Sequence, residues 1–318
     1  MRTAGRILVT PRSVTRDGHP ALEPLRQAGY EVVFSMPGVQ PDESELLDLL
    51  PGCIGYLAGV EKVSAGVLEA ARDLKVISRN GTGIDNIDLP AAERLGIQIV
   101  PAAGANARGV AELAIGLMLS LARSLPWSDA GLKAGQWQRR KGIELEGKVL
   151  GLIGCGRIGR LVARMASGLD MRVVGFDPFP PAEGCGIEFR SFDDVLAVSD
   201  ILSLHCPACE VKPLIDADAV ARMKKAALLI NAARASLIDP LAVMKALESG
   251  QLAGFATDVF ENEPPGDDPL LRLPNVIATP HIGALTAESI DRAVTAAVNG
   301  LLAVLAGGQP SGKLKGAL

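Results

Sequence analysis

The chain has 318 residues, of which 48% are hydrophobic and 21% charged, and its formal net charge is −4. This length fits two domains of about 100–200 residues, and the apolar content is enough for a sizeable core, which excludes a disordered chain. The slight acidic excess and the lack of a long Lys/Arg tract argue against a nucleic-acid-binding protein.

The sequence also gives no sign of export or of membrane insertion. The apolar run at the N-terminus is too short for the core of a signal peptide. The longest helix-like apolar stretch, Leu113–Ala122, is about half of the ~20 residues that a membrane-spanning helix needs. Five cysteines, an odd number, do not form a disulfide framework. We therefore expect a soluble, cytoplasmic protein that has neither a membrane nor a nucleic acid as partner.

The first hundred residues alternate between short apolar runs and helical patterns, which is typical of a parallel sheet covered by helices. The predicted strands are Arg6–Thr10, Tyr30–Phe34, Gly55–Ala58, Val76–Ser78 and Gln98–Val100, and the predicted helices are Glu43–Leu50, Ser64–Ala71 and Leu89–Leu95.

Next, Asn106–Leu125 has the pattern of one long amphipathic helix, and Ser128–Gly147 is a polar stretch. A second alternation of strands and helices begins at Lys148, and the Pro-rich segment Glu261–Pro274 predicts a loop. A final helix is expected from about Ala284 to Leu305. The strands predicted in this second half are Val149–Ile153, Arg172–Phe176, Ile201–His205, Ala227–Asn231, Gly254–Thr257 and Val276–Ala278.

A glycine-rich turn follows the first strand of the second half and precedes a helical pattern at Arg160–Gly168. In this turn Gly154 permits the tight bend, Gly156 lets the backbone approach a pyrophosphate, and Gly159 lets helix and strand pack closely. Asp177 ends the next strand, 18 residues after Gly159, where it can accept hydrogen bonds from ribose hydroxyls. The complete order of strand, glycines, helix, strand and acid predicts a site for NAD rather than NADP, and no metal site is expected.

Three polar residues follow strands of the second half. Arg234 comes after Ala227–Asn231, Glu263 comes after Gly254–Thr257, and His281 comes after the last strand. Since ligands of doubly wound sheets bind outside the carboxyl ends of the strands, these side chains can converge. A guanidinium can hold a 2-oxo acid carboxylate, an imidazole can exchange a proton with the carbonyl oxygen, and a carboxylate can orient that imidazole. The set predicts hydride transfer to a 2-oxo acid.

The same segments resemble the D-isomer-specific 2-hydroxyacid dehydrogenase family, and within it the D-3-phosphoglycerate dehydrogenase branch in a short form that lacks the regulatory domain. The resemblance runs from about residue 50 to residue 300. The segments that carry it are 79–88 (RNGTGIDNID), 106–113 (NARGVAEL), 151–159 (GLIGCGRIG), 231–239 (NAARASLID), 258–265 (DVFENEPP) and 279–283 (TPHIG).

This resemblance implies two doubly wound α/β domains, with a Rossmann-type NAD domain at 104–284 inserted into a flavodoxin-like substrate domain at 1–103 and 285–318. It implies that Arg234 binds and activates the substrate, that His281 is the acid/base and that Glu263 tunes His281. It also implies a homodimer through the helix region 106–125. The implied NAD contacts are Gly154, Gly156, Arg157, Ile158, Gly159, Asp177, Cys206, Ala232, Ala233, Asp258 and Gly283, and the implied substrate contacts are Thr82 and Gly83 beside Arg234.

The chain departs from the phosphoglycerate branch where that branch carries an Arg for the distal phosphate. The segment Leu57–Glu61 reads LAGVE, a neutral loop with an added carboxylate, which is poorly suited to a phosphate. Arg12, or Arg139 and Arg140 of a partner subunit, are alternative phosphate-binding cations, so a phosphoglycerate-like or a hydroxypyruvate-like substrate stays open.

Two further alternatives stay open. Corepressors of this fold sense NAD(H) and keep the same Arg, Glu and His, so the motifs alone also permit a nucleotide-sensing binding protein. The pair Cys206 and Cys209 has the spacing of a redox or zinc dithiol, although no second pair or nearby His supports a zinc site.

Overall fold

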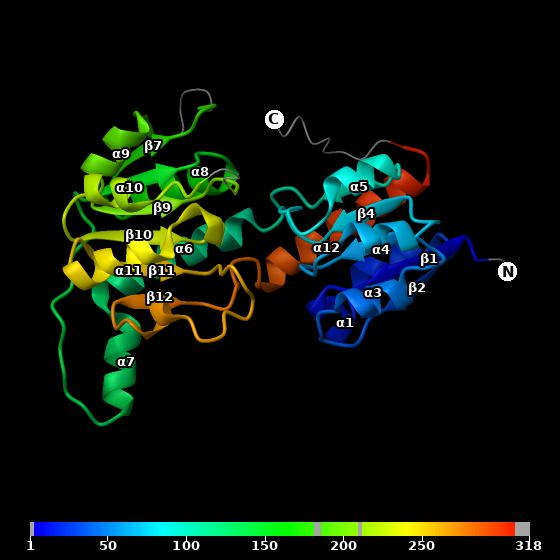
Figure 1. The fold of residues 1–318 in the computed structure, drawn as a ribbon, viewed down its shortest axis with the longest axis horizontal. Helices are drawn as coiled ribbons and strands as arrows, with labels where there is room; N and C mark the ends of the chain where they lie inside the picture. The colour runs from blue at the N-terminus through cyan, green and yellow to red at the C-terminus, as the bar shows by residue number, and fades with distance from the viewer. Residues whose placement is uncertain (1–2, 181–185, 209–211, 309–318) are drawn as a thin grey trace. The chain divides into compact units, whose positions relative to one another are not determined.

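The computed structural model describes residues 3–180, 186–208 and 212–308. The chain forms two compact units (Figure 1). The first unit comprises Met1–Asn106 and Thr286–Leu318, and the second comprises Ala107–Leu285. The second unit is therefore an insertion in the chain of the first.

The first unit contains a five-stranded, fully parallel sheet in the order β2-β1-β3-β4-β5. This is the flavodoxin-like strand order, as the sequence predicts. Its direction reverses at β1, because the chain adds β2 on one side of β1 and β3 on the other. The strands are β1 Gly5–Val9, β2 Tyr30–Phe34, β3 Cys53–Ala58, β4 Val76–Arg79 and β5 Gln98–Pro101.

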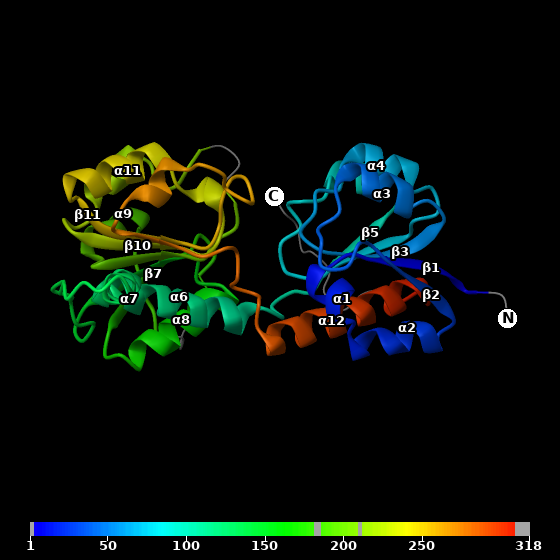
Figure 2. The same cartoon turned by 90° about the horizontal axis from the view of Figure 1, so that it is seen from below.

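Helices cover both faces of this sheet (Figure 2). Leu46 of α3, Leu68 of α4 and Ala91 of α5 belong to the apolar core on one face. On the other face α12 packs against β3, β4 and β5, and its Val298 and Leu301 are buried in the core. The helices of this unit are α1 Arg12–Asp17, η1 Pro20–Leu22, α2 Glu23–Gln27, α3 Glu43–Leu49, α4 Ala65–Ala70, α5 Leu89–Arg94 and α12 Ala287–Leu305.

The second unit contains a seven-stranded, fully parallel sheet in the order β12-β11-β10-β9-β6-β7-β8. This is the Rossmann order with one further strand at the β12 end. The predicted strands are confirmed, and the two-residue β8 is an addition too short to give a hydropathy pattern. The strands are β6 Val149–Ile153, β7 Arg172–Phe176, β8 Glu188–Phe189, β9 Ile201–Leu204, β10 Ala227–Asn231, β11 Leu252–Thr257 and β12 Val276–Ala278.

This sheet is also covered on both faces. Figure 2 shows α6 and α8 on one face and α9 and α11 on the other. The two apolar cores differ accordingly, because Leu117 and Met118 of α6 pack with Val162 of α8, whereas Val195 of α9 packs with Val243 of α11. The helices are α6 Ala107–Arg123, α7 Leu125–Lys133, α8 Arg157–Ser167, α9 Phe192–Val198, α10 Ala217–Arg222, η2 Ala235–Leu237, α11 Pro240–Ser249 and η3 Pro269–Arg272.

The long helix expected at 106–125 is present, but it ends two residues earlier than predicted, and the polar stretch that follows contains part of a further helix. The helix α6 ends at Arg123, Ser124 takes the left-handed conformation with φ of 51°, and a separate helix α7 follows. Pro126 lies at the start of α7, where a missing N–H costs nothing and the fixed φ favours a helix. Within the described ranges no single helix is long and apolar enough to cross a membrane. Only α6 and α7 taken together reach that length and apolar content, and the two helices are bent by 63° relative to each other.

Candidate active site

The glycine-rich turn lies at the carboxyl end of β6 and is packed too tightly for side chains. A Cβ on Gly154, whose φ is 91°, would lie 2.6 Å from the backbone nitrogen of Cys206, and one on Gly159 would lie 2.3 Å from the carbonyl oxygen of Gly154. At Gly156, by contrast, a Cβ would meet no atom within 4 Å. The first and third glycines thus serve packing, and the second leaves the backbone open to a ligand.

This turn lies at the point where the strand order of the second unit reverses. The chain adds β7 on one side of β6 and later β9 on the other, and Gly154 packs against the residues that follow β9. The 11-residue helix α8 begins here with Gly156 as its N-cap, so its first N–H groups and its dipole face the position of an anion. The arrangement fits the pyrophosphate of a dinucleotide.

Asp177, directly after β7, is fixed beside this turn. Its Oδ2 accepts a hydrogen bond of 2.8 Å from the backbone N–H of Cys155, and its Oδ1 accepts one of 2.9 Å from the N–H of Phe179. Each carboxylate oxygen can accept a further hydrogen bond, so the side chain is held in place and can still take ribose hydroxyls.

The ends of β10, β11 and β12 are joined into one edge. The N–H of Asp258 donates to the carbonyl of Asn231 at 3.1 Å, and the N–H of Thr279 donates to the carbonyl of Thr257 at 3.0 Å. These bonds continue the parallel ladders beyond the last strand residues. The turns that carry Arg234, Asp258 and His281 therefore leave the sheet side by side.

His281 and Glu263, which the sequence predicts to act together, have their side chains in contact, and their acid/base role stays a prediction. Both carboxylate oxygens of Glu263 lie 2.8 Å from Nδ1 of His281, so this nitrogen carries the proton that the carboxylate accepts. The side chain of His281 is 41% exposed and that of Glu263 is 36% exposed, so solvent reaches the pair. His281 takes φ of 52°, an uncommon left-handed backbone conformation that His adopts more readily than most residues.

Asp258 holds the turn that carries this histidine. The residue is only 2% exposed. Its Oδ1 accepts hydrogen bonds from the Thr279 hydroxyl at 2.6 Å and from the N–H of Ile282 at 2.8 Å, and its Oδ2 accepts one from the N–H of Gly283 at 2.8 Å. The sequence assigns Asp258 to the nicotinamide side, which stays a prediction, but its observed contacts make it the clamp of residues 279–283.

Asn231 is a site residue that the sequence analysis did not single out. Its side chain donates to the carbonyl of Arg234 at 2.8 Å and accepts from the N–H of Ala233 at 3.1 Å. The residue is fully buried at the end of β10, and it shapes the turn from which the Arg234 side chain leaves. An Asn that ends a buried strand, just before the candidate Arg, was the available signal.

The other predicted contacts lie on two edges. Thr82 and Gly83 follow β4 in the first unit. The Thr82 hydroxyl donates to Oδ1 of Asn106 at 2.9 Å, and the role of both residues stays a prediction.

The second edge carries Cys206 and the remaining predicted NAD contacts. Cys209 lies outside the described residues, so the hypothesis of a Cys206–Cys209 dithiol stays untested. At the carboxyl edge of the second unit, Arg157 is exposed, Ile158, Cys206 and Ala232 are partly buried, and Ala233 and Gly283 are buried.

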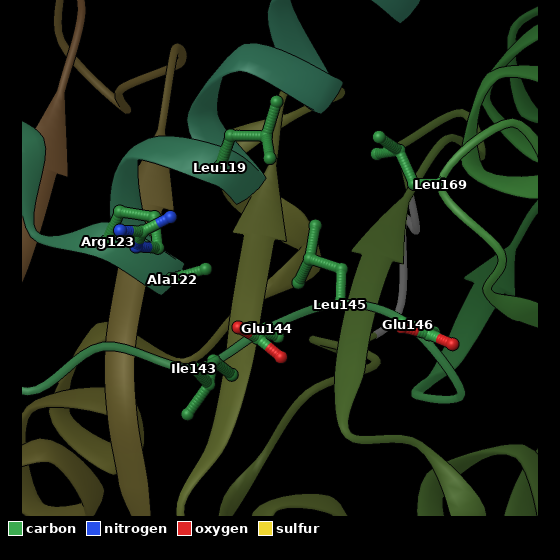
Figure 3. Close-up of a pocket in the computed structure, with 8 residues that line it drawn as sticks. All are labelled: Leu119, Ala122, Arg123, Ile143, Glu144, Leu145, Glu146 and Leu169. Carbon is green, nitrogen blue, oxygen red and sulfur yellow. The ribbon is translucent and has the colours of Figure 1, made fainter.

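A pocket of about 370 Å³ in the second unit does not belong to this edge (Figure 3). It lies between the end of α6, the segment that leads into β6 and Leu169. That segment enters β6 at the opposite end from the glycine turn, so we assign the pocket no part in the chemistry. Its lining residues are Leu119, Ala122, Arg123, Ile143, Glu144, Leu145, Glu146 and Leu169.

Comparison with known proteins agrees with this geometry. Residues 115–283 match the family model for the NAD-binding domain of D-isomer-specific 2-hydroxyacid dehydrogenases. A hydroxypyruvate reductase of Thermotoga maritima is 41% identical over 258 residues, which cover 79% of this chain and 84% of that protein. A D-3-phosphoglycerate dehydrogenase of Methanocaldococcus jannaschii is 45% identical over 253 residues, which cover 77% of this chain. The aligned region is only 48% of that relative, so the chain spans about half the length of the phosphoglycerate dehydrogenases it matches.

A solved structure, that of the TT0316 protein from Thermus thermophilus, has the same fold. It superposes with a TM-score of 0.88 at 36% identity, and the match covers 96% of this chain and 98% of that one.

We expect replacement of Asp258 by Asn to destabilise the protein. An amide has one acceptor oxygen instead of two, so at least one of the three groups that bind Asp258 loses its partner inside the protein. The free energy of unfolding should fall by about 1–3 kcal/mol in urea titrations. Asp267→Asn, at a carboxylate that is 79% exposed, is the matched control and should change it little. If the two substitutions lowered the free energy of unfolding equally, Asp258 would not be the residue that holds the turn 279–283.

We expect His205, at the end of β9, to make the free energy of unfolding depend on pH in the acidic range. Its Nδ1 is buried with no hydrogen-bond partner among the described residues, and burial lowers the pKa of the imidazole from 6.5 to about 4. Because the unfolded chain takes up this proton at higher pH than the folded protein, His205 should lower stability progressively as the pH falls from about 6.5 to about 4. Urea titrations of His205→Asn should show a shallower loss of stability over this window, and an equal loss in the variant and the parent protein would contradict this role of His205.

Proposed function

The chain belongs to the D-isomer-specific 2-hydroxyacid dehydrogenase family, and on this premise we propose that it is an NAD-dependent enzyme that transfers a hydride between a D-2-hydroxy acid and NAD. The observation that carries the proposal is the His281–Glu263 pair, with Nδ1 held 2.8 Å from the carboxylate, on the sheet edge that also carries Arg234. An imidazole fixed through Nδ1 is suited to exchange a proton through Nε2.

In the proposed reaction, the guanidinium of Arg234 binds the carboxylate of the 2-oxo acid and polarises its carbonyl group. His281 gives its Nε2 proton to the carbonyl oxygen during reduction and takes the hydroxyl proton back during oxidation. Glu263 acts on His281 alone, by fixing the orientation of the ring and by stabilising the imidazolium. Asn231 and Asp258 hold the two turns, so the geometry is set before the substrate binds.

NAD accepts or supplies the hydride when it is bound. We assign its pyrophosphate to the glycine turn and the N-terminus of α8, with Gly156, Arg157 and Ile158 in contact. Asp177 takes the ribose hydroxyls and would repel the 2′-phosphate of NADP. The nicotinamide end is assigned to the ends of β9, β10, β11 and β12, after which Cys206, Ala232, Ala233, Asp258 and Gly283 lie.

The substrate class is a small 2-hydroxy or 2-oxo acid, with phosphoglycerate-like and hydroxypyruvate-like molecules as the candidates. We assign the substrate domain to residues 1–103 and 285–318 and the NAD domain to 104–284, with the substrate carboxylate bound by backbone N–H groups near Thr82 and Gly83. The relatives named above are enzymes, which favours this function over a nucleotide-sensing corepressor.

We also propose that the protein is cytoplasmic and forms a homodimer through the helix region 106–125, and that the separate helix α7 extends this contact. The large apolar side chains Leu117 and Met118 of α6 are buried within the unit. In and after α7, however, Leu125, Leu132 and Trp137 are 52%, 60% and 82% exposed, and a dimer contact would cover such a surface.

The activity is tested by following NADH oxidation with a panel of 2-oxo acids, including glyoxylate, pyruvate, hydroxypyruvate and 3-phosphohydroxypyruvate. We expect His281→Ala and Arg234→Ala to lower kcat/KM by about 10²- to 10⁴-fold with the best substrate. Glu263→Gln should lower kcat with little change in KM, because Glu263 does not touch the substrate. Glu261→Gln, at an exposed site in the same loop, is the matched control. NADH binding without turnover of any acid would favour the sensor instead.

The dimer is tested by sedimentation velocity. We expect the parent protein to sediment as a dimer and the double variant Leu132→Glu, Trp137→Glu to sediment as a monomer, because two charges would face an apolar contact. Leu241→Glu, in α11 and 61% exposed, should leave the dimer intact. A monomeric parent protein would refute this part of the proposal.

A further inference from the structure

The first unit has its own reversal of strand order, between β1 and β3. Ligands of such sheets bind outside the carboxyl ends of the strands at this point. Here the backbone N–H of Thr10, which follows β1, donates to the carbonyl of Leu57 in β3 at 3.1 Å. The loop 59–61 continues directly from β3. The side chains in loop 59–61 and directly beneath it therefore determine which chemical group of a ligand can bind at this reversal of strand order.

A buried carboxylate lies under the loop. Glu61 is 2% exposed, and its Oε1 accepts hydrogen bonds from the hydroxyls of Thr10 and Tyr56 and, at 2.8 Å, from the N–H of Gly59. Burial and the neighbouring carboxylate raise the pKa of the Tyr56 phenol well above its usual value, so Tyr56 stays protonated and donates. Among the described residues these donors are all uncharged, so none of them neutralises the carboxylate.

The opposite charge lies further along the same edge. Arg79, at the end of β4, is 8% exposed, and it donates to the carbonyl of Asn80 at 2.8 Å and to Oδ1 of Asn86 at 3.4 Å. The Asn86 amide in turn donates to the carbonyl of Glu61 at 2.6 Å, which ties the two loops together. The edge is thus polarised, with a cation under the turn 80–83 and an anion under the loop 59–61.

We propose that Glu61 is a specificity-determining residue, which excludes a second anionic group from the substrate and selects a 2-oxo acid with an uncharged tail over its phosphate ester. This inference rests on the proposed function. The common carboxylate binds at the cationic end, near Thr82 and Gly83, and the tail of the substrate points to the anionic end. Val60, 40% exposed above Glu61, offers that tail an apolar contact. A phosphate there would meet a negative charge that water screens poorly.

The test compares hydroxypyruvate with 3-phosphohydroxypyruvate. We expect kcat/KM of the parent protein to favour hydroxypyruvate by about tenfold or more. Glu61→Gln should narrow this ratio, and Glu31→Gln, which removes a charge at an exposed site of the same unit, should not. Calorimetric titration with D-glycerate and D-3-phosphoglycerate makes the same comparison without turnover.

Three results would overturn the proposal. The first is tighter binding or faster reduction of the phosphorylated compound by the parent protein. Loss of that preference in Arg12→Ala would then identify the exposed Arg12 as the phosphate site. The second is binding of D-3-phosphoglycerate to the parent protein as tight as that of D-glycerate, which decides the question even if Glu61→Gln fails to fold. The third is a folded Glu61→Gln protein with the parent ratio. Selective binding of D-glycerate without turnover of any acid would instead refute the proposed function and leave Glu61 as the selecting residue.

Discussion

In a fully parallel sheet every strand ends at the same edge, and this constraint assembles the candidate active site. Arg234, Asp258 and His281 come from three separate parts of the sequence, yet each follows one of the adjacent strands β10, β11 and β12. Backbone hydrogen bonds continue between these strands beyond their last residues. The sheet therefore supplies the proximity of the three turns, and single polar side chains such as Asn231 and Asp258 supply the finer geometry.

The two sheets use the same device for different ligand groups. Each reverses its strand order next to its first strand. A glycine lies near that point in both, but Gly154 follows the first strand of its sheet, β6, whereas Gly59 follows β3. Gly154 opens onto the N-terminus of a long helix and is suited to an anion. A Cβ on Gly59 would instead lie 2.6 Å from the buried Glu61 carboxylate, so the corresponding point of the first unit carries negative charge. The reversal points of the two sheets thus differ in the charge that lies beside them.

Much of this architecture could be predicted from the sequence, because buried parallel strands leave short apolar runs and the glycine turn has fixed spacing. The predicted bounds of strands such as β6 and β10 agree with the structure to the residue. The break between α6 and α7 escaped prediction, because apolar periodicity continues across Ser124 while its backbone turns left-handed. The clamp role of Asp258 escaped for another reason, since its partners are mostly backbone N–H groups, which every sequence has and no pattern reveals.

The helix α12 completes the core of the five-stranded unit, although the whole second unit lies between it and β5 in the chain. During synthesis on the ribosome, β1 to β5 consequently emerge without the helix that covers one of their faces. In the finished protein, α12 residues such as Val298 and Leu301 cover Ile7, Val9 and Leu57. These three side chains consequently lack that cover until the entire 107–285 segment has been synthesised. The inserted unit has all its own strands and helices by then and can fold first. The unit that begins first along the chain is thus the one whose core is completed last.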